Sequence, residues 1–309
     1  MGPDENALDA QDVANMLGVS RNTVYNLVKS GELASYSVGR KMRFTMQDVE
    51  AYIAAARGGE RTSASSQTPR KVASPPAASA FRIAGNDIAA DMIANYLGQA
   101  GLPIERLYHN SYQSLEEMYT AGVEAAVIHL YDRKTKSFNI PYVQRIVPGT
   151  PLVVMHLVRR RQGFLVRQRN PKELRTWVDL LRDDVEIANR ERGAGSRVLL
   201  DEQLIALEAG SMPKGYDRQF LSPLGAAAFV AQGGADVTIG DERVYHQVDG
   251  LDFLPMIEED LAVVLAKTDK TIKPIRFLQR VMESRGFKTE LSHNIGYDTM
   301  HTGEVLYEV

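Results

Sequence analysis

The sequence contains no cysteine and only one tryptophan among its 309 residues. Without thiols, the chain can form no disulfide, no thiolate metal site and no cysteine nucleophile. Its apolar runs are shorter than the roughly 20 residues that cross a bilayer, and its polar, acidic N-terminus is unlike a signal peptide. We therefore expect a cytoplasmic protein with no membrane partner.

Sequence patterns of common catalytic sites are also missing. The chain has no Walker motif, no G-x-S-x-G elbow and no pair of histidines at metal-ligand spacing. His109 and His129 follow predicted strands and either could point into a cleft, although a core or surface histidine is the commoner outcome. The sequence therefore predicts no catalytic residue, no metal site and no cofactor.

The chain is long enough for two domains, and its 44% hydrophobic and 24% charged residues are ordinary for globular protein. Residues 58–80 are small and polar and include three prolines, so they cannot bury enough surface to fold. We interpret them as a flexible linker between an N-terminal domain (1–57) and a C-terminal domain (81–309).

The N-terminal domain begins with a helix-turn-helix pattern. Asp9 and Asp12 have the spacing of a capping box at the start of a first helix. Gly18 can end that helix, and Ser20 can cap a second one over about 21–29. Apolar positions of the first helix share helical spacing and are expected to be buried together: Val13, Met16 and Leu17.

A basic hairpin follows over residues 35–44, and a third helix is expected from Thr45 or Met46 to Ala56. Between Ser20 and Phe44 there are five basic residues and one acidic residue, so this segment has a net charge of +4, whereas the whole chain has a net charge of −3. Such an excess is expected where a protein contacts backbone phosphates. The residues predicted to contact DNA are Ser20, Arg21, Asn22, Thr23, Tyr25, Arg40, Lys41 and Arg43.

Segments 8–25, 29–33 (KSGEL) and 38–44 (VGRKMRF) resemble the excisionase-type, MerR-related winged helix-turn-helix. The resemblance implies that the second helix enters the major groove of double-stranded DNA and that the hairpin contacts its backbone. The alternative is a small helical domain that serves protein contacts.

The C-terminal domain alternates apolar strands with amphipathic helices. Strands near 81–85, 106–109 and 125–130 predict a parallel α/β sheet. Two strands (152–160 and 163–166), joined through a solvated basic run at Arg159–Arg161, lead into a second set that begins with a helix at Pro171 and a strand at 185–189. Two further strands return over 253–267. We expect two lobes, lobe I (about 81–155 and 255–309) and lobe II (about 160–250).

Several predicted strands turn directly into helices whose free N–H groups favour an anion. Simpler alternatives are helix caps at Ser114 and Ser222, tight turns at Gly193 and Gly195, and pairing of the arginines with nearby acidic residues such as Glu191. The residues predicted to bind a small anionic ligand, an oxyanion or small carboxylate, are Asn86, Asp87, Ser111, Ser114, His129, Arg190, Gly193, Gly195, Ser196, Arg197 and Ser222.

Blocks at 128–132, 139–143, 189–197, 226–236 and 296–304 resemble the PBP-like domain, which is related to the molybdate-type and LysR-type substrate-binding folds. The resemblance implies a two-lobe, type 2 fold with a ligand between the lobes, and it makes molybdate or tungstate a candidate ligand. Relatives tend to have smaller residues where this chain has Tyr112 and Gln113, so we expect either a narrower cleft or a different ligand.

Together these features predict a one-component transcriptional regulator in which a small α and β-hairpin winged helix-turn-helix precedes a two-lobe α/β sensor. A homodimer or higher oligomer is expected because one such head makes few DNA contacts. The alternatives are an excisionase-like architectural factor, and an enzyme or binding protein of molybdenum cofactor metabolism.

The second helix and the basic hairpin together generate a direct test. Arg21→Ala should weaken operator binding at least tenfold, because a base contact is worth about 1–3 kcal/mol. Arg40→Ala with Lys41→Ala should weaken binding to all sequences and lower the salt dependence by roughly one unit per residue. Fluorescence anisotropy at several salt concentrations measures both effects, with Lys134→Ala and Lys136→Ala in the C-terminal domain as the control. Unchanged affinity in both variants would contradict the assignment.

Overall fold

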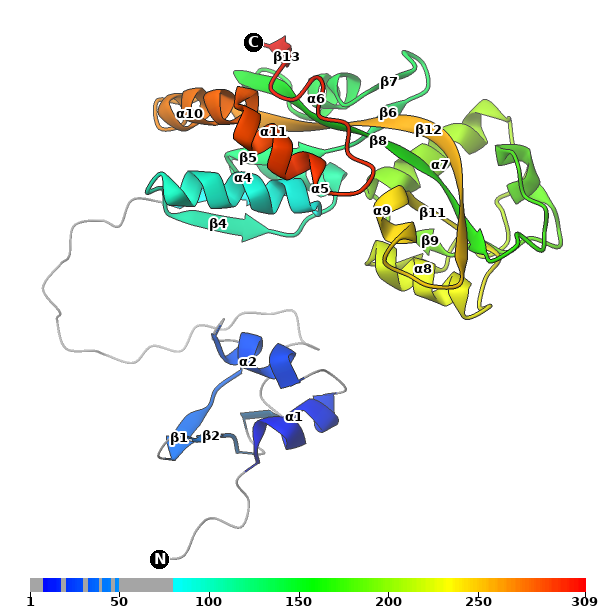
Figure 1. Ribbon diagram of the computed structural model, residues 1–309, viewed down its shortest axis with the longest axis horizontal. Coiled ribbons are helices and arrows are strands. Elements are labelled where there is room, and N and C mark those ends of the chain that lie inside the picture. Colours follow the sequence, from blue (N-terminus) through cyan, green and yellow to red (C-terminus); the bar gives the residue numbers. More distant parts are fainter. Residues whose placement is uncertain (1–7, 18–20, 30–32, 39–40, 46–47, 50–79) are drawn as a thin grey trace, which may run out of the picture. The chain divides into compact units, whose positions relative to one another are not determined.

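The computed structural model describes residues 8–17, 21–29, 33–38, 41–45, 48–49 and 80–309 (Figure 1). The chain forms two compact units, residues 1–74 and 75–309, each of which is described by itself. The predicted DNA contacts Ser20 and Arg40, and all of the predicted linker except its last residue, lie outside the described residues. Among those described, no helix has the length and apolar composition needed to span a bilayer.

The N-terminal unit contains helices α1 (Ala10–Leu17) and α2 (Arg21–Lys29) and an antiparallel hairpin of β1 (Tyr36–Val38) and β2 (Lys41–Arg43). The capping box is confirmed: the Asp9 N–H donates to Asp12 Oδ2 (2.9 Å), and the Asp12 N–H donates to Asp9 Oδ1 (3.0 Å). A second reciprocal pair of hydrogen bonds lies where the third helix was predicted to start. The Thr45 N–H donates to Asp48 Oδ2 (2.9 Å), and the Asp48 N–H donates to Thr45 Oγ1 (3.2 Å).

The small core of this unit corrects one prediction. Met16 is 46% exposed, because Ala10, Val13 and Ala14 form the buried stripe of α1 and Met16 lies to the side of it. Leu27 and Val28 of α2 pack against the core. Its buried residues are Ala10, Val13, Ala14, Val24, Leu33, Phe44 and Val49.

The C-terminal unit is built on a seven-stranded sheet whose order is β11-β8-β12-β5-β3-β4, with β13 paired to β8. β3 pairs in parallel with both β4 and β5, and α4 (Ile88–Gln99) and α5 (Ser111–Tyr119) connect them, so the predicted parallel unit is confirmed. The strands are β3 (Phe81–Ala84), β4 (Ile104–Leu107), β5 (Ala125–Ile128), β8 (Leu152–Arg167), β11 (Val237–Asp241), β12 (Leu251–Ala266) and β13 (Val305–Glu308).

Strands β8 and β12 run the length of this unit, and the prediction of two shorter strands in each region was wrong. They pair antiparallel from Arg167 opposite Leu251 to Leu152 opposite Ala266. A register shift between Pro255 and Ile257, opposite Gly163, lets the pair bend without ending. The two strands therefore link lobe I, where β12 pairs with β5, to lobe II, where β8 pairs with β11.

Lobe II contains less regular structure than predicted. The helix predicted from Pro171 is a short 3₁₀ helix, η1 (Trp177–Leu181), capped by Thr176, and the strand predicted at 185–189 is reduced to β9 (Asn189–Arg190) and isolated bridges. The remaining elements of the unit are β6 (Tyr131–Asp132), β7 (Ser137–Phe138), α6 (Ile140–Ile146), α7 (Gly195–Ala206), β10 (Gln219–Phe220), α8 (Pro223–Ala231), α9 (Glu242–Tyr245), α10 (Ile272–Glu283) and α11 (Arg285–Ser292).

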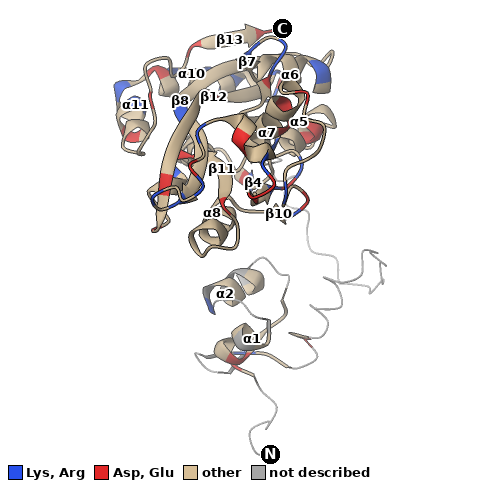
Figure 2. Ribbon diagram, turned by 90° about the vertical axis from the view of Figure 1, so that its right-hand side faces the viewer, with Lys and Arg blue, Asp and Glu red and all other residues tan. Residues whose placement is uncertain are grey.

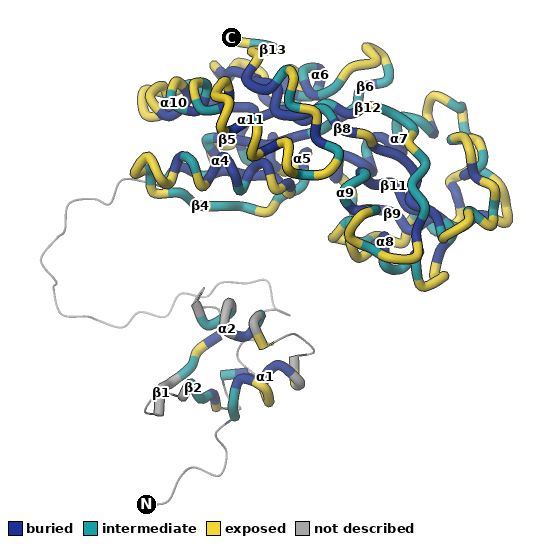
Figure 3. The backbone as a smooth tube through the Cα atoms, viewed as in Figure 1, coloured by how far each residue is buried: buried dark blue, intermediate teal, exposed yellow. Residues whose placement is uncertain are grey.

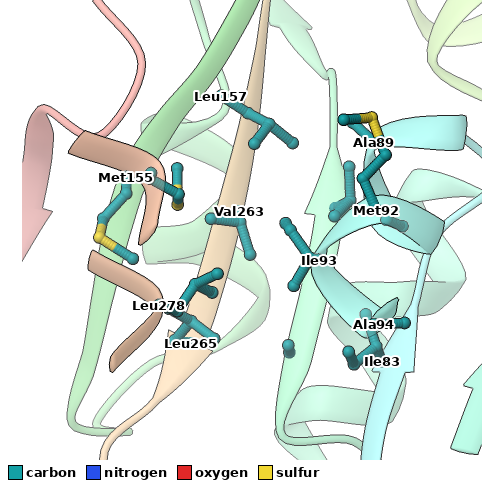
Figure 4. Packing of buried hydrophobic residues seen from close by; sticks show 14 of the residues in the cluster. Ile83, Ala89, Met92, Ile93, Ala94, Met155, Leu157, Val263, Leu265 and Leu278 are labelled. Atoms are coloured by element: carbon teal, nitrogen blue, oxygen red, sulfur yellow. The ribbon is translucent and has the colours of Figure 1, made fainter. Parts of the chain in front are cut away.

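Side-chain alternation along the strands builds a core on each face of the sheet. The strands of the sheet are largely buried (Figure 3), and Figure 4 shows packed residues of one of the two clusters, among them Ile93. In β5, Ala125 and Val127 join the cluster under α4, α10 and α11, whereas Ala126 and Ile128 join the cluster under α5 and α6. The sheet is thus covered on both faces. Its loops at the carboxyl ends of β3 and β5 are left to form a site.

Candidate functional site

A cavity lies between lobes I and II, where the ends of β3, β5 and β11 meet the first turn of α7. Its volume is about 50 Å³, and on this measure one water needs roughly 10–15 Å³. The cavity therefore holds a few waters or one small polar group. Seven of the predicted ligand-binding residues line it: Asn86, Asp87, Ser111, His129, Arg190, Gly195 and Ser196.

The first turn of α7 supplies hydrogen-bond donors to this cavity. Ala194 precedes the helix and has no side chain that could cap it. Within residues 80–309, the N–H groups of Gly195 and Ser196 and the Ser196 hydroxyl have no hydrogen-bond partner. Ser111 Oγ accepts a bond from the His129 N–H (3.2 Å), which leaves its own proton available. These uncharged donors suit an oxygen acceptor at the positive end of the helix.

Beside the donors lies a buried guanidinium, which corrects the prediction of a solvated basic run. Arg160 is 5% exposed, because side chains alternate along β8 and Arg159 and Arg161 face the other way. Its Nη1 lies 2.7 Å from Asp87 Oδ2 and 3.2 Å from Asp241 Oδ2, and its Nε donates to Glu259 Oε1 (2.7 Å). Carboxylates from α4, β11 and β12 thus surround one cation.

Asp87 has no free lone pair for a ligand. Its Oδ1 accepts from the Ala89 N–H (2.9 Å) and the Tyr297 hydroxyl (2.6 Å), and its Oδ2 faces Arg160 and Arg243, the latter at 3.5 Å. Burial alone would raise the pKa of Asp87, but the two guanidinium groups outweigh it and lower the pKa to about 2. Asp87 is therefore a structural anion of the cavity wall.

Glu259 anchors the other side of the network beneath His129. It is fully buried, and its Oε2 lies 3.0 Å from His129 Nδ1. Burial raises the pKa of Glu259, but the neighbouring His129 and Arg160 lower it further than burial raises it. In the orientation that satisfies its hydrogen bonds, the Gln162 amide donates to Glu259 Oε1 (2.9 Å). The ring of His129 is thereby held in the cavity wall.

Two glycines let the lobes touch. A Cβ at Gly195 would overlap the His129 ring and carbonyl oxygen across the cleft. Gly193 has φ +91°, as a tight turn requires, and its carbonyl accepts from the Tyr112 N–H (3.1 Å). The Asn110 side chain donates to the Arg192 carbonyl (3.2 Å) beside it. The loop before α7 is therefore docked on the first turn of α5.

Four predicted ligand-binding residues lie outside the cavity lining. Ser222 caps the Gly225 N–H (3.2 Å), and Ser114 donates to the Asn110 carbonyl (2.8 Å). Arg197 is buried between Asp201, at 3.0 Å, and the Tyr216 ring. The fourth, Gly193, lines a separate pocket with Tyr112 and Gln113, and these two residues do not line the cavity itself.

For one predicted residue, Arg190, the structure supports the simpler alternative, and several lining residues were not predicted at all. Arg190 pairs with Glu191 (2.9 Å), as one alternative held. His109 is not among the cavity residues. In the described part of the chain, no group of three or more His, Asp or Glu side chains is arranged to hold a metal ion. The missed lining residues include Arg160, Gln162, Asp241 and Arg243; strand alternation could have indicated Arg160.

The predicted DNA contacts are only partly described. Arg21 is exposed at the start of α2, and Thr23 is half-buried. Arg43 lies 3.9 Å from Asp9. Asn22 and Tyr25 lie on α2 and Lys41 on β2, with side chains outside the described set. In the C-terminal unit, basic and acidic residues are interleaved along the ribbon (Figure 2).

Comparisons with known proteins agree with this arrangement. Residues 7–57 match the helix-turn-helix domain family, and residues 94–283 match the PBP superfamily domain. Bacillus subtilis (strain 168) protein YvgK is 37% identical over 303 residues, which cover 96% of this chain and 97% of that protein. Rv2310 of Mycobacterium tuberculosis (strain ATCC 25618 / H37Rv) is 46% identical over 52 residues, 17% of this chain and 46% of its own.

Among solved structures, the ancestral amino acid-binding protein AncCDT-1, a precursor of cyclohexadienyl dehydratase, superimposes with a TM-score of 0.50 at 16% identity. The match covers 69% of this chain and 94% of that one. At this identity it shows the fold alone. The predicted fold class, a helix-turn-helix head with a two-lobe α/β binding fold, is confirmed.

The contact between Gly195 and His129 yields one prediction. Gly195→Ala adds a methyl group that cannot fit between the lobes. The free energy of unfolding should therefore fall by about 1–3 kcal/mol and Tm by several degrees. Differential scanning calorimetry measures the change. Gly210→Ala is the matched control, since a Cβ there meets nothing within 4 Å. Equal Tm values for the two variants would show that the lobes do not touch at Gly195.

Asp87 gives a pH prediction. Its folded pKa of about 2 lies below the unfolded value of 3.8, so its contribution of about 2 kcal/mol is complete above pH 4 and is lost as pH falls towards 2. The difference in the free energy of unfolding between the native chain and Asp87→Asn should therefore shrink by about 1.5 kcal/mol from pH 7 to pH 2.5, where the folded carboxyl group is still mostly ionised. Urea unfolding at the two pH values measures it, and a constant difference would refute the pairing.

Proposed function

The chain belongs to the family of the PBP superfamily domain and carries a helix-turn-helix domain before it, and from that premise we propose that it is a transcriptional regulator controlled by a small ligand. The N-terminal unit would bind operator DNA, with Arg21 and the hairpin residues Arg40, Lys41 and Arg43 among its contacts. The cavity between lobes I and II would bind the ligand. Neither of the two family matches indicates a catalytic family.

The observation that carries the ligand proposal is the set of unpaired donors in the cavity. The N–H groups of Gly195 and Ser196 belong to lobe II, and the Ser111 hydroxyl belongs to lobe I. Each arginine of the cavity wall already faces a carboxylate: Arg160 and Arg243 face Asp87, and Arg190 pairs with its neighbour. The cavity would therefore recognise a small anionic group, such as a carboxylate, molybdate or tungstate, through these uncharged donors. The buried Nε of Arg243, which has no hydrogen-bond partner within residues 80–309, lies in the same wall.

A ligand held by both lobes would favour the closed arrangement over the open one. It can shift that equilibrium only by the difference in its affinity for the two states. A homodimer or higher oligomer would turn this shift into a change of operator affinity, because two heads must match two half-sites in the major groove. If the closed lobes place the two heads at the distance of the half-sites, the ligand would increase operator binding. If the open lobes do so, the ligand would release the operator.

The test joins binding to DNA affinity. Molybdate, tungstate, sulfate, acetate and benzoate are screened by thermal shift, and those that raise Tm are added to an anisotropy titration with genomic operator fragments. We expect at least one anion to raise Tm and to change DNA affinity by about fivefold or more. Ser111→Ala with Ser196→Ala should remove both effects, whereas Ser211→Ala, on an exposed turn, should keep them. Absence of any Tm shift with all five anions would defeat the proposal.

A further inference from the structure

A second pocket adjoins the cavity at the mouth of the cleft. Its volume is about 320 Å³, which is within the range of small-molecule sites. Four residues line both spaces, so the two adjoin along shared walls: Asn86, Asp87, Pro223 and Arg243. We refer to the inner space as the cavity and to this one as the mouth pocket.

The mouth pocket has apolar walls on both lobes. Ile88 and Tyr108 line it from lobe I, and Pro223, Leu224 and Val244 line it from lobe II. Tyr108 is 66% exposed and Leu224 is 42% exposed, although both are large side chains. Covering such surface is favourable by roughly 25 cal/mol per Å².

Tyr108 is held in place on the lobe I side. The Arg106 guanidinium lies 4.7 Å from the centre of its ring, and its hydroxyl donates to Asp91 Oδ1 (3.3 Å). Arg106 also pairs with Asp91 (2.8 Å), so these charges are matched to each other. A ring fixed in this way offers a preformed apolar surface with little loss of side-chain entropy on binding.

The charges of the mouth pocket argue against a second anionic group there. Asp87 and Asp91 both line it, and Arg243 already faces Asp87 at 3.5 Å. A second negative charge would meet two carboxylates, whereas an uncharged apolar group would meet Tyr108 and Leu224. A bare oxyanion would fill only the cavity and leave the mouth pocket empty.

We propose that the ligand is an organic monoanion whose anionic head lies in the cavity at Gly195 and Ser196 and whose apolar body lies in the mouth pocket against Tyr108 and Leu224. This inference rests on the proposed function, because it uses the same cavity for the head. It assigns Tyr108 and Leu224 as specificity-determining residues. It also predicts that organic carboxylates bind with higher affinity than molybdate and tungstate.

Isothermal titration calorimetry on the full chain tests the inference with acetate, butyrate, benzoate, molybdate and tungstate. Affinity should rise at least tenfold from acetate to benzoate and exceed that of both oxyanions. Tyr108→Ala and Leu224→Ala should each remove about three- to tenfold of the benzoate affinity and leave acetate unchanged. Tyr119→Ala and Ile205→Ala, exposed residues that do not line the mouth pocket, are the matched controls.

Two results would overturn the inference without touching the proposed function. One is tightest binding of molybdate or tungstate, unaffected by Tyr108→Ala or Leu224→Ala. The other is equal affinity for acetate and benzoate. A loss of binding in Ser111→Ala with Ser196→Ala in either case would keep the cavity as the site of the head. No binding of any of the five anions would refute both proposals.

Discussion

The structure of the C-terminal unit depends on one buried cation. Moving a guanidinium out of water costs several kcal/mol, and only well-placed carboxylates offset that cost. Arg160 meets three of them, and they come from three different elements: Asp87 before α4, Asp241 at the end of β11 and Glu259 on β12. Because Arg160 belongs to β8, each of these three elements must end beside β8 or run along it. That requirement brings lobes I and II together at a single place.

The same constraint decides which chemistry is left for a ligand. Asp87 is saturated by Ala89, Tyr297 and the two guanidinium groups, and Glu259 is held by Arg160 and His129. Among residues 80–309, the groups of the cavity wall without hydrogen-bond partners include the neutral donors on the first turn of α7 and Nε of the Arg243 guanidinium. A ligand would complete a set of hydrogen bonds between two lobes that the ion network has already positioned. Such preorganisation lowers the cost of binding.

Local signals in the sequence predicted what local interactions decide. The capping box of Asp9 and Asp12 and the strand-to-helix turns depend on residues within four positions of one another. The burial of Arg160 depends instead on Asp87, 73 positions away, and on Glu259, 99 positions away. Likewise, Gly195 is needed because His129 packs against it from the other lobe. Strand alternation can indicate that Arg160 faces inward, but no local pattern identifies the distant residues that contact it.

The account makes its most direct claim about two backbone groups, the N–H groups of Gly195 and Ser196. Residue-resolved hydrogen exchange by NMR measures them, with the anion that gives the largest thermal shift and without it. We predict fast exchange in the free protein and at least tenfold slower exchange in the complex, with smaller changes at the capped first turn of α8. A ligand that binds tightly and leaves both amides unprotected would contradict the account.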